Sequence, residues 1–215
     1  MPGDDAVYTV ELSDHVHDGI LFDFDGVLAD TEPVHFACWR EILSPFGIDL
    51  EWDLYAAQCI GVSDRLMLER FALALQPPVP VEVLWNEYPR KKELFRRRAE
   101  TADFLEPEII ALIRSLSGFP MAVVTSSGRS EVEPVLIRAG VRDHFRAMVC
   151  GLEVPNLKPA PDPYQKAAEL LHLRNPLVVE DSDAGEQSGH AAGFRVLRVT
   201  STREVPRLIR KALRL

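Results

Sequence analysis

The sequence predicts an α/β fold, a parallel β-sheet with helices on both faces and a helical segment inserted after the first strand. Two observations lead to this fold class. From residue 106 onward, short apolar runs alternate with helical stretches, and strands that alternate with helices form parallel sheets with right-handed crossovers. Between about residues 33 and 101, in contrast, the pattern is helical, without a strand-like run.

The composition limits what the chain can bind. It has 215 residues, of which 47% are hydrophobic and 27% charged, enough for one large domain or a domain with a substantial insertion. With 33 acidic residues against 24 Lys and Arg, the net charge is -9, which argues against nucleic-acid and acidic-membrane binding. An anionic substrate is still compatible with this charge, because its site needs only local positive charge or a metal.

The cysteines and the apolar runs bear on location. Cys38, Cys59 and Cys150 are widely spaced and form neither a disulfide framework nor a metal-ligand pattern, so we interpret them as small buried hydrophobes. The apolar runs are shorter than the ~18 residues of a membrane span, and the acidic N-terminus lacks the features of a signal peptide. We therefore expect a cytoplasmic protein in a reducing setting, without membrane association.

The first strand ends in the most informative stretch, residues 20–30. Side chains two apart on a strand point the same way, so Asp23 and Asp25 should direct their carboxylates together at the strand's carboxyl end, where open α/β sheets bind ligands. Gly26 then permits a tight turn. Two like charges this close call for a cation between them, and such oxygen ligands suit Mg²⁺. The alternative is a pair of turn or helix-capping acids.

The other elements follow in order along the chain. Residues 1–18 are polar, with a weak strand pattern at 6–12, and we interpret His15 and His17 as surface histidines. The insertion should hold helices at 31–46, 63–75 and 81–102, with Pro89 a kink or break in the third. In the remainder we expect strands at 120–125, 147–150, 177–179 and 195–199, and helices at 106–116, 129–139, 161–171, 184–192 and 204–213.

Polar residues follow two more of these strands, and a lysine stands between them. Hydroxyls and backbone N–H groups at Thr125 and Ser126, just before a helix, suit a phosphate oxygen, although both residues are also common helix caps. Lys158, in a proline-rich loop, is a plausible point charge for phosphate, and an exposed loop lysine is its ordinary interpretation. Asp181 could complete a Mg²⁺ site begun by Asp23, with Glu180 supporting it from behind.

Together these motifs resemble the four-motif signature of the haloacid dehalogenase-like (HAD) superfamily, in the order Asp-x-Asp-Gly, Thr-Ser-Ser, Lys-Pro, Glu-Asp. Asp23-Phe-Asp-Gly-Val-Leu-Ala-Asp, Lys158-Pro-Ala-Pro-Asp and Glu180-Asp-Ser-Asp-Ala-Gly are similar to its β-phosphoglucomutase and phosphoglycolate phosphatase-like branch nearly word for word. The resemblance runs from about residue 19 to 199. It implies a Rossmann-like core, residues 19–32 and 102–215, with a helical cap at 33–101, and leaves the extension 1–18 unexplained.

The resemblance also implies roles. Asp23 would attack phosphorus and form an aspartyl-phosphate, while Asp25 would protonate the leaving oxygen and later take a proton from water. The catalytic set would further include Thr125 and Lys158. Phosphate would bind at Gly26, Thr125, Ser126 and Lys158, and Mg²⁺ at Asp23, Asp181 and the backbone carbonyl of Asp25, with Glu180 behind. Dehalogenase members lack the second aspartate, so we set dehalogenation aside.

Substrate choice should rest with the cap, which would close over the site and exclude water. Gly61-Val62-Ser63-Asp64-Arg65 is similar to the family's cap loop. His35 matches a histidine that β-phosphoglucomutase links to proton control, and Lys91 is the cap lysine we assign to it; a packed helix residue is the alternative for His35.

One departure from the phosphomutases favours a phosphatase over a phosphomutase. Their cap loop carries a basic residue where this chain has Asp64, and Arg65 could replace it only if the loop shifts by one residue. We therefore expect a Mg²⁺-dependent phosphatase that acts, as a monomer, on a small phosphorylated sugar or related metabolite. A sugar phosphomutase is the alternative, and a non-catalytic module that binds phosphorylated metabolites is a further one.

Overall fold

The computed structural model describes residues 17–215 except 61 and 100. It divides into two compact units, a core that contains Asp103–Leu215 and the described residues up to Asp30, and a helical unit, Thr31–Ala102. The weak strand expected at residues 6–12, His15 and Gly61 lie outside the described residues.

The core is built on a five-stranded parallel sheet in the order β3-β2-β1-β4-β5, so the predicted α/β fold class is confirmed. Its central strand pairs Leu21 with Ala122 on one side and Val178 on the other. Such strands are buried on both faces, which explains why they are short, continuous apolar runs. The strands are β1 (Ile20–Phe22), β2 (Met121–Val124), β3 (Ala147–Val149), β4 (Leu177–Glu180) and β5 (Arg195–Arg198).

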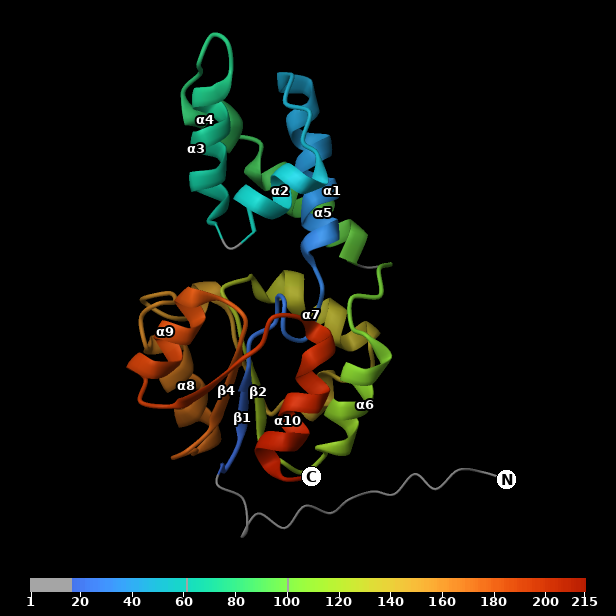
Figure 1. Ribbon diagram of the computed structural model, residues 1–215, viewed down its shortest axis with the longest axis vertical. Helices are drawn as coiled ribbons and strands as arrows, with labels where there is room; N and C mark the ends of the chain where they lie inside the picture. Colours follow the sequence, from blue (N-terminus) through green and yellow to red (C-terminus); the bar gives the residue numbers. More distant parts are fainter. Residues whose placement is uncertain (1–16, 61, 100) are drawn as a thin grey trace, which may run out of the picture. The chain divides into compact units, whose positions relative to one another are not determined.

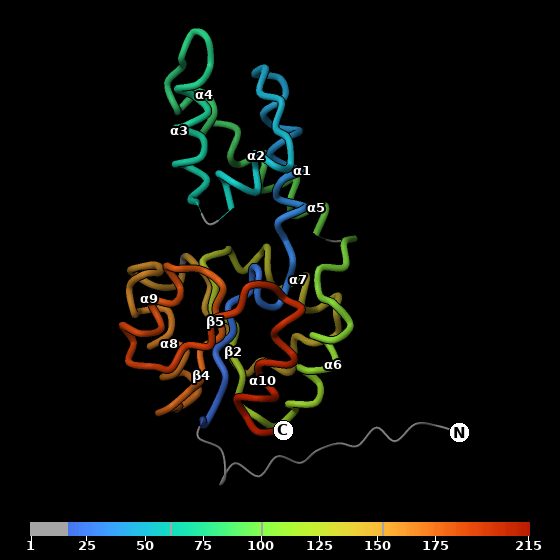
Figure 2. Tube along the Cα trace, viewed as in Figure 1, coloured from blue at the N-terminus to red at the C-terminus, as the bar shows by residue number. Residues whose placement is uncertain are grey.

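Helices cover both faces of this sheet (Figure 1). α8 (Asp162–Leu171) packs on β1, β2 and β3, and α9 (Asp183–Ala191) packs on β4 and β5. On the other side, α6 (Pro107–Ser115) and α10 (Val205–Leu213) pack on each other. Figure 2 shows β5 beside β4, at the edge of the sheet. α7 (Arg129–Arg138) follows β2, and the predicted core elements agree with the observed ones to within about two residues.

The helical unit agrees with the predicted kink or break near Pro89 and differs from its prediction in one place. The third expected helix is broken: α4 (Val81–Trp85) ends before α5 (Tyr88–Ala99), and Pro89 falls in the first turn of α5, where a missing N–H costs little. A short helix, α2 (Trp52–Gln58), was not predicted. The other helices are α1 (Glu32–Leu43), which a 3₁₀ turn at Ser44–Phe46 extends, and α3 (Asp64–Ala74). A cluster around Trp39, Leu50 and Leu68 forms the core of the unit.

The interpretation of His17 as a surface histidine is wrong. Its side chain is buried, with Nδ1 3.2 Å from the carbonyl oxygen of Asn175, and the neighbouring Asp18 carboxylate accepts the backbone N–H groups of Arg174 and Asn175. This contact fastens the start of the described chain beside β4. All three cysteines are buried, as predicted. Within the described ranges, the helices are too short or too polar to cross a membrane.

Candidate active site

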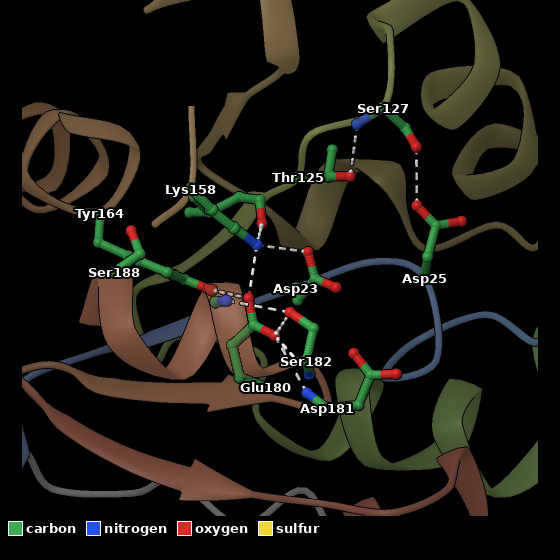
Figure 3. Close-up of polar contacts among 12 residues, drawn as sticks. Asp23, Asp25, Thr125, Ser127, Lys158, Tyr164, Glu180, Asp181, Ser182 and Ser188 are labelled. Carbon is green, nitrogen blue, oxygen red and sulfur yellow. Dashed lines mark hydrogen bonds and ion pairs between the residues drawn. The ribbon is translucent and has the colours of Figure 1, made fainter. Parts of the chain in front are cut away.

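The predicted site residues meet where the parallel strands end (Figure 3). Asp23 follows β1, Thr125 follows β2, and Glu180 is the last residue of β4, with Asp181 next to it. Because β1 lies between β2 and β4, these side chains reach the same edge of the sheet. The loop before α8 brings Lys158 to the same place.

Lys158 is the centre of this cluster, so the alternative of an exposed loop lysine is wrong. Its side chain is 5% exposed, and its ammonium lies 2.6 Å from Asp23 Oδ1 and 2.6 Å from Glu180 Oε1. The third contact of Nζ is the carbonyl oxygen of Val124, at 2.9 Å. An ammonium has three protons, and these three acceptors use all of them. The lysine is therefore fixed in direction as well as in position.

One ammonium shared between two buried carboxylates leaves the site short of positive charge. Burial raises the pKa of Asp23 well above its ordinary value; Lys158 opposes this, whereas Glu180 and Asp25 add to it. Burial acts against the charge of Lys158 too, but its two carboxylate partners raise its pKa, so it stays protonated. For Glu180, burial is outweighed by Lys158, Tyr164 and the N–H of Ser182, which lower its pKa.

The acidic residues fit a bound metal ion. Carboxylate oxygens of Asp23, Glu180 and Asp181 lie within 4.8 Å of one another. Burial, together with the charges of Glu180 and Asp25, raises the pKa of Asp181 to about 6, and the opposing charges of Arg198 and Lys158 do not compensate for this. Oxygen donors of this kind suit a hard divalent cation. Gly26 leaves room for them: its φ is +73°, and a Cβ there would lie 1.9 Å from Asp181 Oδ2.

Glu180 is held by donors on both of its oxygens. Oε1 accepts hydrogen bonds from Lys158 and from the Tyr164 hydroxyl, and Oε2 accepts them from the N–H groups of Asp181 and Ser182 and from the Ser182 hydroxyl. Ser182 also caps α9 by accepting the N–H of Gly185. Sequence reasoning does not single out Tyr164, because a buried aromatic residue at helical spacing is typical of core packing.

Gly185 makes room for Glu180, which leads to a prediction. A Cβ at position 185 would lie 1.8 Å from Glu180 Oε1. An alanine in a helix normally stabilises it relative to glycine, but here we expect Gly185→Ala to destabilise the protein by about 2 kcal/mol through overpacking, as measured by denaturant unfolding. The same change in a Glu180→Ala background should be neutral or stabilising. Stabilisation by Gly185→Ala in the parent protein would contradict this packing.

Asp25 does not join the metal cluster through its side chain, contrary to the expectation from strand alternation. β1 ends at Phe22, so the alternation does not extend to residue 25. Instead, Asp25 Oδ2 accepts a hydrogen bond from the Ser127 hydroxyl at 2.7 Å, and Figure 3 shows it turned toward Ser127. The N–H of Ser127 in turn donates to Thr125 Oγ1 at 3.0 Å. Ser127 therefore links two predicted catalytic residues. Ser126, which stands between Thr125 and Ser127 in the sequence, is exposed.

In the helical unit, His35 and Lys91 are in contact. Lys91 Nζ lies 2.8 Å from His35 Nδ1, and the imidazole stacks on Phe95 with ring centroids 4.1 Å apart. Lys91 is buried, and its ammonium lies 3.7 Å from Asp64 Oδ2. Asp64 also accepts the indole N–H of Trp39 at 3.0 Å. The acid at position 64 thus balances a buried lysine inside this unit.

The cap-loop residues have local partners. Arg65 forms an ion pair with Glu82 at 3.0 Å and lies over the Trp85 ring, with its guanidinium carbon 5.2 Å from the centroid. Ser63 caps α3, since its hydroxyl accepts the N–H of Leu66 at 3.3 Å. The N–H of Val62 donates to the carbonyl of Cys59 at 3.0 Å.

Comparison with known proteins adds the family. Residues 20–199 match the family model described as haloacid dehalogenase-like hydrolase. The chain is 33% identical over 186 residues to a fructose-1-phosphate phosphatase, YqaB, of Escherichia coli, covering 84% of this chain and 95% of that one. It is 29% identical over 180 residues to a phosphorylated carbohydrates phosphatase of Thermotoga maritima, covering 82% of each chain.

One of the similar solved structures holds a bound sugar phosphate. A mutant of CbbY from Rhodobacter sphaeroides in complex with xylulose-(1,5)bisphosphate is similar with a TM-score of 0.68 and 27% identity, covering 87% of this chain and 89% of that one. The matched residues include Asp23 and Asp181, which follow β1 and β4, and Lys158 in the loop before α8. This chain therefore belongs to the haloacid dehalogenase-like hydrolase family.

Proposed function

We propose that the protein is a Mg²⁺-dependent phosphatase that hydrolyses a small, sugar-like phosphate monoester through an aspartyl-phosphate. The observation that carries this proposal is the buried Asp23–Lys158 pair beside Asp181 at the carboxyl edge of the sheet. An anionic phosphate can approach an anionic nucleophile only where positive charge compensates both. Lys158 supplies one such charge, and Mg²⁺ held by Asp23, Asp181 and the Asp25 carbonyl would supply the rest.

The side chains divide the reaction between them. Asp23 attacks phosphorus, and because Lys158 holds Oδ1, the carboxylate has a defined orientation for that attack. Asp25 gives a proton to the leaving oxygen and afterwards takes one from the water that cleaves the acyl phosphate. The Ser127 hydroxyl orients Asp25 for both transfers. Thr125, the N–H of Ser126 and the turn at Gly26 receive the phosphoryl oxygens, and Glu180 supports Lys158 from behind.

Two observations support the proposed substrate class, one from the relatives and one from the helical unit. Relatives with similar sequences include phosphatases of fructose 1-phosphate and of phosphorylated carbohydrates. Arg65 is already paired with Glu82, so it is poorly placed to hold a second phosphate, which supports a phosphatase. The His35–Lys91 contact favours the second candidate, a sugar phosphomutase. We assign selection of the sugar to His35, Lys91 and the loop residues Gly61, Val62, Ser63 and Arg65.

A screen of phosphate esters tests the proposal. The protein would be assayed with Mg²⁺ for phosphate release from fructose 1-phosphate, the 1- and 6-phosphates of glucose, phosphoglycolate and nucleotides. We expect release that chelation abolishes and that is strongest on a sugar phosphate. Interconversion of the glucose phosphates faster than their hydrolysis would favour the phosphomutase. Binding of these esters without turnover of any of them would support the non-catalytic module that binds phosphorylated metabolites.

Metal binding should depend on pH through Asp181. Its pKa of about 6 lies above the ordinary 3.8, so the metal-free folded protein binds a proton there that the unfolded chain releases. This contribution to stability is present at low pH and is lost as pH rises through 6. Mg²⁺ must displace the same proton, and burial also raises the pKa of Asp23, the other proposed ligand, so the apparent affinity should fall below pH 6 by about tenfold per pH unit or more.

Thermal unfolding measures this effect. We expect Mg²⁺ to raise the unfolding temperature clearly at pH 7.5 and much less at pH 5. Asp181→Asn should show little Mg²⁺ stabilisation at either pH. A Mg²⁺ shift in the parent protein that is the same at both pH values would contradict the assignment of Asp181.

A further inference from the structure

Tyr164 has a polar contact that the proposed reaction does not yet use. It lies in α8 with its side chain fully buried, and its hydroxyl donates to Glu180 Oε1 at 2.7 Å (Figure 3). A buried tyrosine hydroxyl normally finds a partner, so the contact alone would be ordinary packing. Its partner here, however, is the carboxylate that holds the proposed phosphate-binding lysine.

Glu180 has its hydrogen-bonding capacity filled when Tyr164 is present. Oε2 faces three donors, the N–H groups of Asp181 and Ser182 and the Ser182 hydroxyl, at 3.1 to 3.2 Å. Among the described residues, Oε1 accepts hydrogen bonds from two donors, Tyr164 at 2.7 Å and Lys158 at 2.6 Å. A carboxylate has about four lone-pair sites, so these donors saturate it and fix its rotation. Within the described part of the chain, the Tyr164 hydroxyl shares Oε1 with the lysine.

The hydrogen bonds that Oε1 accepts affect where Lys158 lies. The ammonium is divided between Glu180 Oε1 and Asp23 Oδ1, both at 2.6 Å. Without the tyrosine hydroxyl, this buried carboxylate oxygen would lose one of the two donors that the described residues give it and would draw Lys158 away from Asp23. Shifts of about 1 Å in groups that position a reacting phosphate are enough to change rates by up to about a hundredfold.

We propose that Tyr164 is a positioning residue: its hydroxyl sets Glu180 Oε1 so that Glu180 holds Lys158 against Asp23. This inference rests on the proposed phosphatase function, in which the charge of Lys158 compensates that of the transferring phosphoryl group. Tyr164→Phe is a suitable probe, because it removes only the hydroxyl. The aromatic ring that lies 5.0 Å from Lys158 Nζ is retained.

A double-mutant cycle with Tyr164→Phe and Lys158→Ala tests this role. Two quantities would be measured for all four proteins in Mg²⁺: kcat and KM with p-nitrophenyl phosphate, and the Kd for inorganic phosphate. We expect Tyr164→Phe alone to lower kcat by about tenfold or more, with a smaller change in KM, and to weaken phosphate binding severalfold. In the Lys158→Ala background the same substitution should change each quantity by less than about twofold.

The helical unit offers a matched control for stability. Tyr55 donates to Glu32 Oε2 at the same distance, 2.7 Å, and is also buried. Tyr55→Phe therefore measures how far the unfolding temperature falls when a buried Tyr–Glu hydrogen bond is lost. A fall of similar size in Tyr164→Phe, with the larger loss of kcat described above, supports positioning.

Two results would overturn the inference: equal effects of Tyr164→Phe with and without Lys158, or no effect of Tyr164→Phe on kcat and phosphate affinity. Failure of the proposed function has a different signature, which is a parent protein that turns over none of the screened esters. In that case the cycle on phosphate affinity still decides whether Tyr164 acts through Lys158.

Discussion

Asp23→Asn is expected to lower phosphatase turnover by a factor on the order of 10⁴ or more, while the protein stays folded. The amide has the size of the carboxylate, and its oxygen can still accept a hydrogen bond from Lys158, but it is a poor nucleophile. Because burial raises the pKa of Asp23, the neutral side chain suits the site, and the metal-free unfolding temperature should be equal or higher. The measurements are kcat on the best ester of the screen and the unfolding temperature without Mg²⁺.

Asp183→Asn is the matched control for this substitution. Asp183 belongs to the acidic run after β4, but its side chain is 90% exposed and pairs with Arg198. We expect its turnover to stay within about twofold of the parent value. If Asp23→Asn retained more than about one part in a hundred of the parent kcat, Asp23 would not be the nucleophile.

The second large effect is expected from Lys158→Ala, which leaves Asp23 and Glu180 buried without their shared cation. Loss of one partner of a buried ion pair costs about 3–5 kcal/mol of folding free energy. We also expect kcat to fall by about 10²–10³-fold, since the charge that faces the phosphoryl group is gone. Chemical unfolding and steady-state kinetics measure the two losses.

The pH dependence separates this cause from a general packing defect. Without Lys158, the pKa of Asp23 rises further, and the pKa of Glu180 rises because the main cause that lowers it is gone, so the folded variant gains stability as both become protonated at low pH. Its stability deficit against the parent protein should therefore be smaller at pH 5 than at pH 8. Lys211→Ala, an exposed change in α10, should show no such dependence. A deficit in Lys158→Ala that is independent of pH would point to lost packing instead.

Much of this site can be predicted from the sequence because parallel strands bring their carboxyl ends to one edge. Asp23, Thr125 and Glu180 each follow or end an apolar run, so their meeting needs only the right strand order. The place of Lys158 came from the resemblance, since a lysine in a proline loop is ordinarily exposed.

The details that sequence reasoning missed depend on contacts between distant residues. Asp25 turns toward Ser127 because β1 ends at Phe22, and strand alternation cannot show where a strand ends. Tyr164 has the sequence pattern of a core aromatic residue, and its role depends on the contact with Glu180, which the sequence does not show. His17, likewise, is buried through a contact with Asn175, 158 positions away. In the helical unit, Pro89 was recognised as a break, but the seven residues of α2 were too few for a periodic signal.

The most direct test of the central claim is to look for the phosphorylated enzyme. The protein would be mixed with Mg²⁺ and the best ester of the screen and quenched in acid during turnover. After digestion, the mass of the peptide that contains Asp23 would be measured by mass spectrometry. We predict one added phosphoryl group on Asp23, absent when Mg²⁺ is chelated and absent in Asp23→Asn. Rapid hydrolysis of the ester with no phosphoryl group on that peptide at any time during turnover would contradict covalent catalysis by Asp23.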